Sequence, residues 1–396
     1  MTKLNVAFFH LLIPDFQNVG GGGAERQFAM IYEYLRKNKL SNSYFIGTNI
    51  GFKNLKKLNI IHHESGLLPV GDVQGSFSRV KKIMSYLKFL YLIRKYRIDV
   101  LHVINHYSQL DRYYKLLKFL PKRSRPKLII QIMDCRMADA LKTGIETENK
   151  LLVRYSKLFN KVNIQGVFSW YENFVEIANE QKVIKSNPII ESAKFCFTDL
   201  KKFKPKQKIN TIVYAARLDN HKRPLLFLDA LIMAIKCNPD KFKSYKLLIF
   251  GNGPLLEDVV KRLEVVRELM AVIHKTHVTD ISPYISTSRF FVSSQNLENF
   301  TSLAMLEAMA CGNVILSRDV GQTDYFVREE LNGFLCKKDS IEEFSKTITK
   351  AILTSTNRLN EMGAESERIA SEEHNVENFC DQLLRFWHKV KNKSLS

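Results

Sequence analysis

The chain lacks the long apolar segments that anchor proteins in membranes. None of its apolar runs approaches the roughly 20 residues that a helix needs to cross a bilayer, so we expect no membrane-spanning helix. The first apolar run, residues 6–13, has no small-residue cleavage site and leads into Pro14 and Asp15, so we expect no signal peptide. The sequence also has no low-complexity tract, which favours ordinary globular domains.

Cysteine is present but follows no recognisable pattern. The six cysteines form no Cys-x-x-Cys and no pairing with histidine at the spacing of metal ligands, and no Asp-x-Asp occurs. We therefore expect reduced thiols, a reducing cytoplasmic compartment, and neither a metal site nor a bound cofactor. The cysteines are Cys135, Cys196, Cys237, Cys311, Cys336 and Cys380.

Acidic residues are scarce relative to basic ones. With 60 Lys and Arg against 40 Asp and Glu, the chain carries a net charge of +20. This balance is typical of proteins that bind nucleic acid, anionic membranes or acidic substrates. We expect an anionic substrate and an anionic membrane surface as partners, and no nucleic acid.

Much of this charge lies in residues 78–97, where the spacing predicts a helix. A basic amphipathic helix can lie on an anionic lipid surface, but it can equally pack one face in the core and keep its basic face in solvent. Residues 116–127 and 200–208 form two further basic segments. The expected apolar stripe consists of Ile83, Leu87, Leu90 and Tyr91, widened by Met84, Phe89 and Ile93. The cations are Arg79, Lys81, Lys82, Lys88, Arg94, Lys95 and Arg97.

What the chain does have is a regular alternation of strand-like and helix-like runs. Its 396 residues are enough for two domains with full cores, and a βα alternation predicts parallel sheets. The polar segment 201–208 contains Pro205 and is a plausible linker; a second βα series follows it. The final helix is expected near residues 376–393. The strands expected before the linker are 4–12, 43–47, 59–62, 100–104, 127–133 and 162–168.

The most informative segment is residues 298–312, ENFTSLAMLEAMACG. It lies between two strand-like runs, 289–294 and 313–317, and its apolar residues recur at helical spacing. Thr301 and Ser302 can cap the helix, and Gly312 can take the left-handed turn at its end. The segment therefore predicts a strand, a polar loop, a helix and a strand.

Two glutamates in this segment indicate a nucleotide site. A helix N-terminus carries partial positive charge and free N–H groups, which suit a phosphate. Glu307, about two turns into the helix, can accept hydrogen bonds from vicinal hydroxyls such as those of a ribose, and Glu298 lies in the preceding loop. Phosphate beside ribose predicts a nucleotide, although both acids could simply be solvated.

Two cations follow another predicted strand. The apolar run 211–215 ends shortly before Arg217, and Lys222 lies five residues further on. A guanidinium and an ammonium at this position can together neutralise a diphosphate. The alternative is a basic loop in a basic protein.

Two glycine-rich segments also follow strands. Residues 248–254, LIFGNGP, place Gly251 in a turn where a backbone can approach a ligand closely, although a plain turn is the simpler reading. Residues 19–26, VGGGGAER, precede an amphipathic helix and contain Gly21, Gly22 and Gly23.

Together these segments resemble the retaining glycosyltransferases of the GT-B fold, family 4. That family has Glu, seven residues, Glu and then Ala-Met-Ala-x-Gly, an Arg-x4-Lys pair, a Gly-x-Gly-Pro turn and a Gly-Gly-Ala-Glu-Arg segment. Here eight residues separate Glu298 from Glu307, so Asn299 competes for the first acidic position. Residues 320–324 and 332–335 match later family segments, with Asp324 in place of Glu. We expect these last two to be turns.

The resemblance implies an α/β fold with two Rossmann-like domains. It implies an acceptor-binding domain of residues 1–203, a nucleotide-sugar domain of residues 208–374, and a terminal helix, 375–396, that packs back on the first. Arg217, Lys222 and Gly251 would contact the donor with Gly21, Gly22, Gly23 and Glu307. The helix start would contribute Asn299, Phe300, Thr301, Ser302 and Leu303.

The implied activity is metal-independent transfer of a sugar from a UDP- or GDP-type donor. The acceptor would be a saccharide, and we expect it to be lipid-linked, in cell-surface polysaccharide or lipopolysaccharide synthesis at the cytoplasmic face of the membrane. A non-catalytic polyanion-binding protein and a nucleotide-sugar epimerase are the alternatives.

The catalytic position of the first domain departs from the family. Relatives often carry a His, followed by Asp, where this chain has Met133 and Asp134. His102 and His106 flank the preceding strand, and a histidine there is more often structural. We therefore assign a catalytic role to Asp134, with a helix cap as the alternative, beside Glu298, Arg217 and Lys222.

Overall fold

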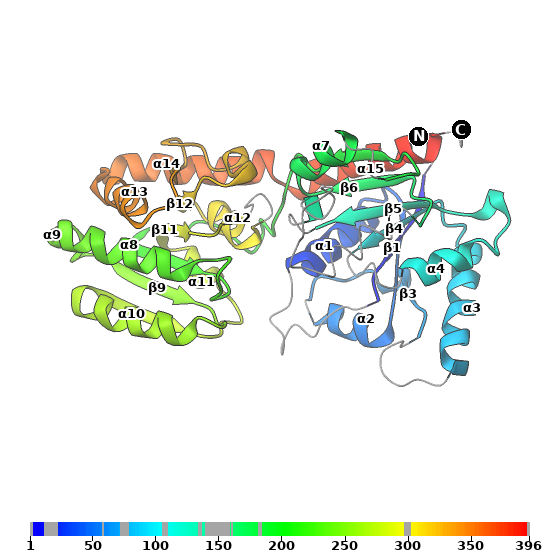
Figure 1. The fold of residues 1–396 in the computed structure, drawn as a ribbon, viewed down its shortest axis with the longest axis horizontal. Coiled ribbons are helices and arrows are strands. Elements are labelled where there is room, and N and C mark those ends of the chain that lie inside the picture. Colours follow the sequence, from blue (N-terminus) through cyan, green and yellow to red (C-terminus); the bar gives the residue numbers. More distant parts are fainter. Residues whose placement is uncertain are drawn as a thin grey trace. The chain divides into compact units, whose positions relative to one another are not determined.

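The computed structural model describes residues 3–11, 23–57, 59–71, 79–104, 110–133, 137–138, 159, 161–180, 184–296 and 302–393. Two compact units divide the chain. Unit 1 comprises Met1–Lys194 and Val376–Ser396, and unit 2 comprises Phe195–Asn375. Figure 1 shows the elements of each unit.

Unit 1 is built on a seven-stranded parallel sheet in the order β3-β2-β1-β4-β5-β6-β7. The strand order reverses beside β1, which pairs with β2 on one side and β4 on the other. Its strands are β1 Asn5–Phe9, β2 Asn42–Gly47, β3 Leu67–Pro69, β4 Val100–Ile104, β5 Lys127–Ile132, β6 Gly166–Ser169 and β7 Ile189–Ser192. Its described helices of more than one turn are α1 Gly23–Lys37, α2 Asn49–Lys56, α3 Arg79–Lys95, α4 Leu110–Leu117, α7 Glu172–Glu180 and α15 Val376–Asn392.

The expected strand at 59–62 is wrong. Asn59 has a positive φ of 52°, and the backbone N–H groups of His62 and His63 donate to the Glu33 carboxylate at 3.0 and 3.2 Å. A side chain thus takes the hydrogen bonds that a neighbouring strand would take. The next strand is β3 instead, and β7 was not expected from the sequence.

The terminal helix α15 packs into the core of unit 1. Its Trp387 side chain is fully buried and lies 5.7 Å from the Phe8 ring of β1 and 5.9 Å from the His102 ring of β4. Burial of rings of this size is a major source of stability. Trp387 and His102, which are 285 positions apart in the sequence, are thereby held in one core.

Unit 2 contains a six-stranded parallel sheet in the order β10-β9-β8-β11-β12-β13. Its strands are β8 Ile209–Ala215, β9 Lys246–Phe250, β10 Ala271–Lys275, β11 Ser288–Ser293, β12 Val314–Arg318 and β13 Gly333–Cys336. Its helices are α8 Pro224–Cys237, α9 Pro239–Phe242, α10 Leu256–Leu269, α11 Ser282–Ile285, α12 Leu303–Ala310, α13 Ile341–Leu353 and α14 Thr356–Arg368.

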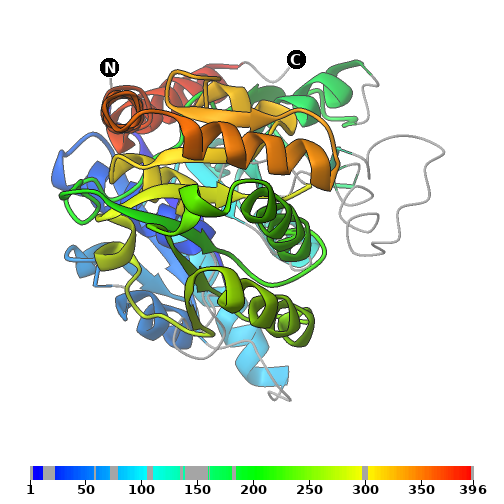
Figure 2. The ribbon, with the colours of Figure 1, turned by 90° about the vertical axis from the view of Figure 1, so that its left-hand side faces the viewer.

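Helices cover both faces of this sheet, as expected of parallel strands that are apolar on both sides. α8, α10 and α13 pack side by side on one face, and α12 and α14 contact each other on the other (Figure 2). The Tyr214 ring at the end of β8 stacks on Phe227 of α8, with ring centroids 5.4 Å apart. This contact fixes the end of β8 against its following helix.

The polar segment 201–208 belongs to unit 2. Phe203 is buried, and the Lys208 ammonium donates to the Cys311 carbonyl at 2.5 Å and the Asn313 side chain at 2.7 Å. Burial lowers the Lys208 pKa to about 8. Lys208 thus forms hydrogen bonds inside unit 2 and is not part of a basic patch on the surface.

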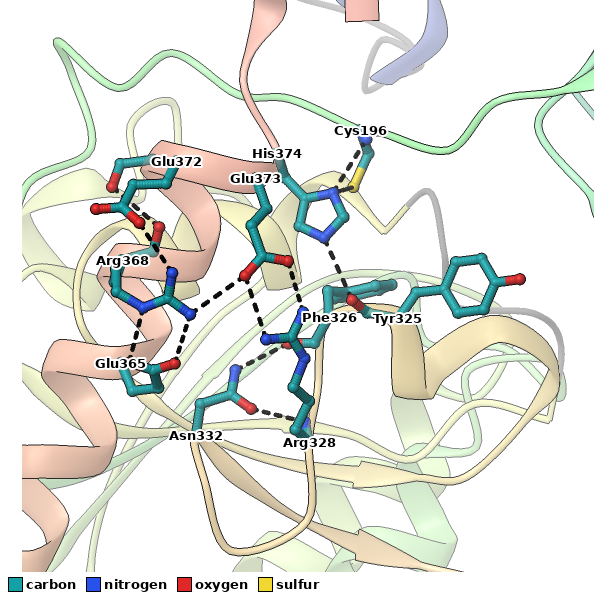
Figure 3. A network of polar contacts seen from close by, with 11 residues as sticks. Cys196, Tyr325, Phe326, Arg328, Asn332, Glu365, Arg368, Glu372, Glu373 and His374 are labelled. Carbon is teal, nitrogen blue, oxygen red and sulfur yellow. Dashed lines mark hydrogen bonds and ion pairs between the residues drawn. The ribbon is translucent and has the colours of Figure 1, made fainter. Parts of the chain in front are cut away.

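The two ends of unit 2 are joined by His374 and Cys196. The Cys196 amide donates to His374 Nδ1 at 3.4 Å, which leaves Nε2 to donate to the Tyr325 carbonyl at 3.4 Å (Figure 3). Next to it, Arg328 forms a two-pronged ion pair with Glu373, and Arg368 also contacts that carboxylate. Burial lowers the His374 pKa, which keeps the ring neutral.

Two expectations concern membranes and cysteines. Within the described residues, no helix combines the length and the apolar character needed to cross a membrane. The five cysteines that the structure describes are unpaired, and all but Cys237 are buried.

Candidate functional site

The sheet of unit 2 has a topological switch point between β8 and β11. β9 lies on one side of β8 and β11 on the other, so the connections leave these neighbouring strands in opposite directions. In open parallel sheets, ligands bind at the carboxyl ends of the strands beside such a point. Arg217 and Lys222 follow β8, and Gln295 follows β11, so all three lie at this edge.

The loop after β8 is organised by Asp219. Its Oδ1 accepts from the backbone N–H groups of His221 and Lys222 at 3.0 and 2.9 Å. Its Oδ2 lies 3.5 Å from Arg217 Nε, while the Arg217 side chain remains 71% exposed. Arg217 is therefore a cation that is oriented by a carboxylate but still open to a ligand.

Lys222 is held against the end of β11. The Lys222 carbonyl accepts from Tyr214 Oη and from Ser294 Oγ, both at 2.9 Å. The Lys222 ammonium donates to Gln295 Oε1. These hydrogen bonds hold the Lys222 backbone against the ends of both β8 and β11. They place the Lys222 ammonium at the switch point.

The glycines of the loop after β9 allow that loop to pack closely against the loop after β8. A Cβ on Gly251 would lie 2.0 Å from the Ala216 carbonyl oxygen, and one on Gly253 would lie 2.4 Å from that of Leu218. The Leu218 N–H also donates to the Asn252 carbonyl at 3.0 Å. The close approach that these glycines permit is therefore to the backbone around Arg217.

Helix α12 follows β11 as the sequence predicted. Ser302 occupies the N-cap position, but its side chain makes no capping hydrogen bond, so that part of the prediction is wrong. Gly312 has φ of +72°, which confirms the predicted left-handed end. Leu303 is half-buried in the first turn, and Glu307 is buried in the second. The burial of Glu307 rules out the alternative that this acid is solvated.

Three polar residues at the same edge were missed by the sequence interpretation. Arg318, at the end of β12, is buried and donates to the Gln295 carbonyl at 3.3 Å. It also pairs with Asp339 at 3.2 Å, and Asp339 pairs with Arg223 at the start of α8. Burial lowers the Arg318 pKa and Asp339 opposes this shift. The available signal was the placement of a polar residue directly after an apolar strand.

Several predicted residues lie outside the described part of the chain. These are Gly21, Gly22, Asp134, Glu298, Asn299, Phe300 and Thr301. Gly23 begins α1 in unit 1. Met133 directly follows β5, and its carbonyl accepts from Tyr171 Oη at 3.4 Å.

The carboxyl end of β1 in unit 1 holds a pair that the sequence interpretation did not select. His10 Nε2 lies 3.4 Å from Glu25 Oε1 of α1, and both side chains are buried. His102, in contrast, lies inside β4, where its Nε2 contacts Gln131 Oε1 at 3.0 Å. His102 is therefore a core residue, in keeping with the structural role preferred from the sequence.

Of the two late segments, residues 320–324 enter a 3-10 turn as expected, but the turn expected at 332–335 is wrong, because only Asn332 lies in a turn and Gly333 begins strand β13. Asn332 is fully buried, and its side chain donates to the Phe326 carbonyl at 2.8 Å and accepts from the Arg328 N–H at 2.7 Å. Asp324 is exposed in a short 3-10 turn. These contacts close the connection between β12 and β13.

Comparison with known proteins agrees with this arrangement. Residues 209–354, which contain the switch point and α12, match the family model described as Glycosyl transferases group 1. An uncharacterized glycosyltransferase of Haemophilus influenzae is 23% identical over 388 residues, covering 92% of this chain and 96% of the relative.

Solved structures share the architecture. A glycosyltransferase from Rickettsia africae has a TM-score of 0.70 at 14% identity, covering 100% of both chains. Anabaena Alr3699/HepE in complex with UDP and glucose has a TM-score of 0.66 at 14% identity, covering 96% of this chain and 98% of the other. At these identities the likeness establishes the fold, which is GT-B. The family match over residues 209–354 and the Haemophilus relative thus make the chain similar to glycosyltransferases of the group 1 type, and its fold is GT-B.

Proposed function

We propose that the chain transfers a sugar from a UDP- or GDP-type nucleotide sugar to a saccharide acceptor, with retention of the anomeric configuration. The observation that carries the proposal is the pair of cations, Arg217 and Lys222, at the switch point of unit 2. This is the edge of a doubly wound sheet where a nucleotide is expected. The UDP bound to the Anabaena protein is consistent with such a donor.

In the proposed reaction, the leaving diphosphate gains charge as its bond to the sugar breaks. Arg217 and Lys222 neutralise that charge, with help from the N–H groups at the start of α12, where Ser302 provides no side-chain cap. The acceptor attacks from the face on which the diphosphate leaves, so the configuration is retained. These protein groups take the place of a metal ion.

We assign roles in substrate binding and catalysis to the other predicted site residues as well. Glu307 accepts hydrogen bonds from the ribose hydroxyls, and Glu298 binds the transferred sugar. Gly251 shapes the donor loop through its contact with Ala216. We assign acceptor binding to unit 1, donor binding to Gly21, Gly22 and Gly23, and a catalytic role to Asp134.

We further propose a lipid-linked acceptor in the synthesis of a cell-surface polysaccharide or lipopolysaccharide, and peripheral attachment to the cytoplasmic face of a membrane. The supporting observation is α3, which leaves several large apolar side chains in solvent beside basic ones. Such a helix suits the interface of an anionic bilayer.

A screen of UDP- and GDP-sugars tests the proposal. Thermal unfolding should rise with the correct donor, because a ligand at 100 times its dissociation constant stabilises by about 2.7 kcal/mol. That donor should release nucleoside diphosphate, faster when acceptor is added. A nucleotide-sugar epimerase would turn over without acceptor, and a non-catalytic polyanion-binding protein would release no nucleotide.

A further inference from the structure

Helix α3 has two apolar faces. Phe89 of α3 is buried against Phe9 and Tyr113, with ring centroids 5.4 and 4.9 Å away. The opposite face carries apolar side chains that are 55% to 67% exposed. A soluble chain rarely leaves so many large apolar groups in water along one helix, so this face indicates a docking surface. We call it the α3 face, and it consists of Val80, Ile83, Met84, Leu87 and Tyr91.

A basic cleft begins where the α3 face ends. Tyr91, the last residue of the face, also lines a cleft of about 1000 Å³ between the end of α3, the start of β5 and the end of α15. Among the described residues that line it, the only acid is Asp99. Its cations are Arg94, Lys95, Arg97, Arg123, Arg125, Lys127 and Lys391.

Most positive charges of this basic cleft are not neutralised by carboxylates of the protein. Asp99 is already paired with Lys391 at 2.9 Å. Arg125 donates to the carbonyls of Leu120 and Lys118 at 2.8 and 2.6 Å. Because carbonyl groups carry no net charge, these hydrogen bonds do not neutralise the guanidinium. Arg94, Arg97 and Arg123 are exposed and form no hydrogen bond or ion pair through their side chains within the described chain. The cleft therefore holds an excess of positive charge that a ligand can balance.

The position of the basic cleft separates it from the site of the reaction. Asp99 directly precedes β4, and Lys127 is the first residue of β5. The cleft therefore lies at the amino ends of these strands. Substrates of open parallel sheets bind at the carboxyl ends. The cleft is thus on the wrong edge of the sheet for a substrate but adjoins the exposed α3 face.

We propose that the basic cleft binds the phosphate headgroup of an anionic phospholipid while the α3 face enters the headgroup region of the same bilayer. Apolar side chains and flanking cations on one surface match the two layers that a membrane interface presents. Guanidinium groups suit phosphate because they donate two parallel hydrogen bonds to it. The inference rests on the membrane attachment proposed above and specifies the lipid that provides it.

Vesicle flotation with the full chain tests the proposal. The cleft variant Arg94→Gln/Arg97→Gln/Arg123→Gln removes three charges from the basic cleft and keeps polar side chains. Its binding to phosphatidylcholine vesicles containing phosphatidylglycerol should fall by about tenfold or more, since each basic residue near an anionic surface contributes appreciably. The matched control Lys236→Gln/Lys241→Gln/Lys261→Gln removes three exposed charges from unit 2 and should bind nearly as the wild type does.

The outcomes separate the possible sources of binding. Equal losses of vesicle binding in both triple variants would mean that the overall positive charge of the protein, and not the cleft, attracts the vesicles. That result would overturn the assignment of the cleft, and so would unchanged binding in the cleft variant. Absence of wild-type binding to anionic vesicles would overturn it too and would leave an acidic protein as the partner to seek. Ile83→Gln/Leu87→Gln should weaken binding to all vesicles. Donor hydrolysis should be unchanged in the cleft variant, which separates a failure here from a failure of the proposed transfer reaction.

Discussion

The indole N–H of Trp387 donates to Nδ1 of His102 across 3.1 Å. Because Nδ1 accepts this bond, Nε2 carries the ring proton and donates to Gln131 Oε1 at 3.0 Å. A protonated ring would set two donors against each other at Nδ1. This buried chain joins the terminal helix α15 to β4 and β5 and depends on a neutral histidine.

The first prediction is an acid-sensitive fold. Burial lowers the His102 pKa to about 3, from an ordinary value of 6.5. Below the ordinary value the unfolded chain binds a proton that the folded chain excludes, so stability falls as pH drops. The expected slope from this one group is about 1.4 kcal/mol per pH unit between roughly pH 6 and pH 4.

Urea unfolding at several pH values measures that slope. His102→Gln should lower stability at pH 7 but show a shallower loss on acidification, since the remaining histidines are common to both proteins. Parallel pH profiles for wild type and variant would contradict the assignment. If the variant does not fold, the wild-type His102 ring should resist protonation in an NMR titration down to about pH 4.

The second prediction concerns the glycines after β9. Gly253→Ala would push a methyl group into the Leu218 carbonyl, and Gly251→Ala would do the same at Ala216. Each should destabilise the fold by about 1–3 kcal/mol, as overpacking does, and raise the donor KM by displacing the Arg217 loop. Gly71→Ala is the control for Gly251→Ala, because both glycines have a positive φ but Gly71 has nothing within 4 Å. Urea unfolding and donor kinetics check this, and equal effects at all three glycines would refute it.

The positions of most strands and the helix after β11 were predictable because periodicity and strand-end placement are local signals. The stretches 211–215 and 100–104 are apolar and short, and both are strands. The strand at 59–62 failed because Glu33, distant in sequence, captures its N–H groups. Lys208 was read as surface charge because nothing local shows that three oxygens surround it.

Helix α3 illustrates a different limit of sequence interpretation. The expected stripe merged residues that the fold separates, since Phe89 and Ile93 are buried while Ile83 and Leu87 are exposed. The sequence interpretation treated core packing and lipid binding as alternatives, yet the helix has one apolar face buried in the core and a second one exposed to solvent. The basic cleft could not be predicted, because residues 94–97, 123–127 and Lys391 meet only in three dimensions.

The third prediction addresses the extra residue between the two glutamates. Glu307 is fixed by the geometry of α12, so we expect the loop before the helix to absorb the insertion. Glu307→Ala should raise the donor KM through lost ribose contacts. Glu298→Ala should depress kcat more than Asn299→Ala does. Steady-state kinetics of the three variants decide the matter, and an active Glu298→Ala beside an inactive Asn299→Ala would reverse the assignment.

The fourth prediction is independence of divalent metals. Since Arg217 and Lys222 are assigned to neutralise the diphosphate, turnover should survive dialysis against EDTA. Rates before and after EDTA treatment, and after addition of magnesium, provide the measurement. Complete loss that magnesium restores would show that a metal performs part of this neutralisation.

The central claim is that the cations after β8 stabilise the departing diphosphate. The Arg217 side chain is largely exposed, and among the described residues its one ion pair is with Asp219, so its removal should leave the fold intact. Turnover should be compared in the wild type, in Arg217→Ala and Lys222→Met, and in Arg267→Ala, which removes an exposed cation from α10. Loss of one oxyanion-stabilising group typically costs roughly 2–4 kcal/mol of transition-state stabilisation. The account predicts a fall in kcat/KM of about 30-fold or more in each of the first two variants and wild-type turnover in Arg267→Ala. Near-wild-type turnover in Arg217→Ala and Lys222→Met, with both proteins folded, would contradict it.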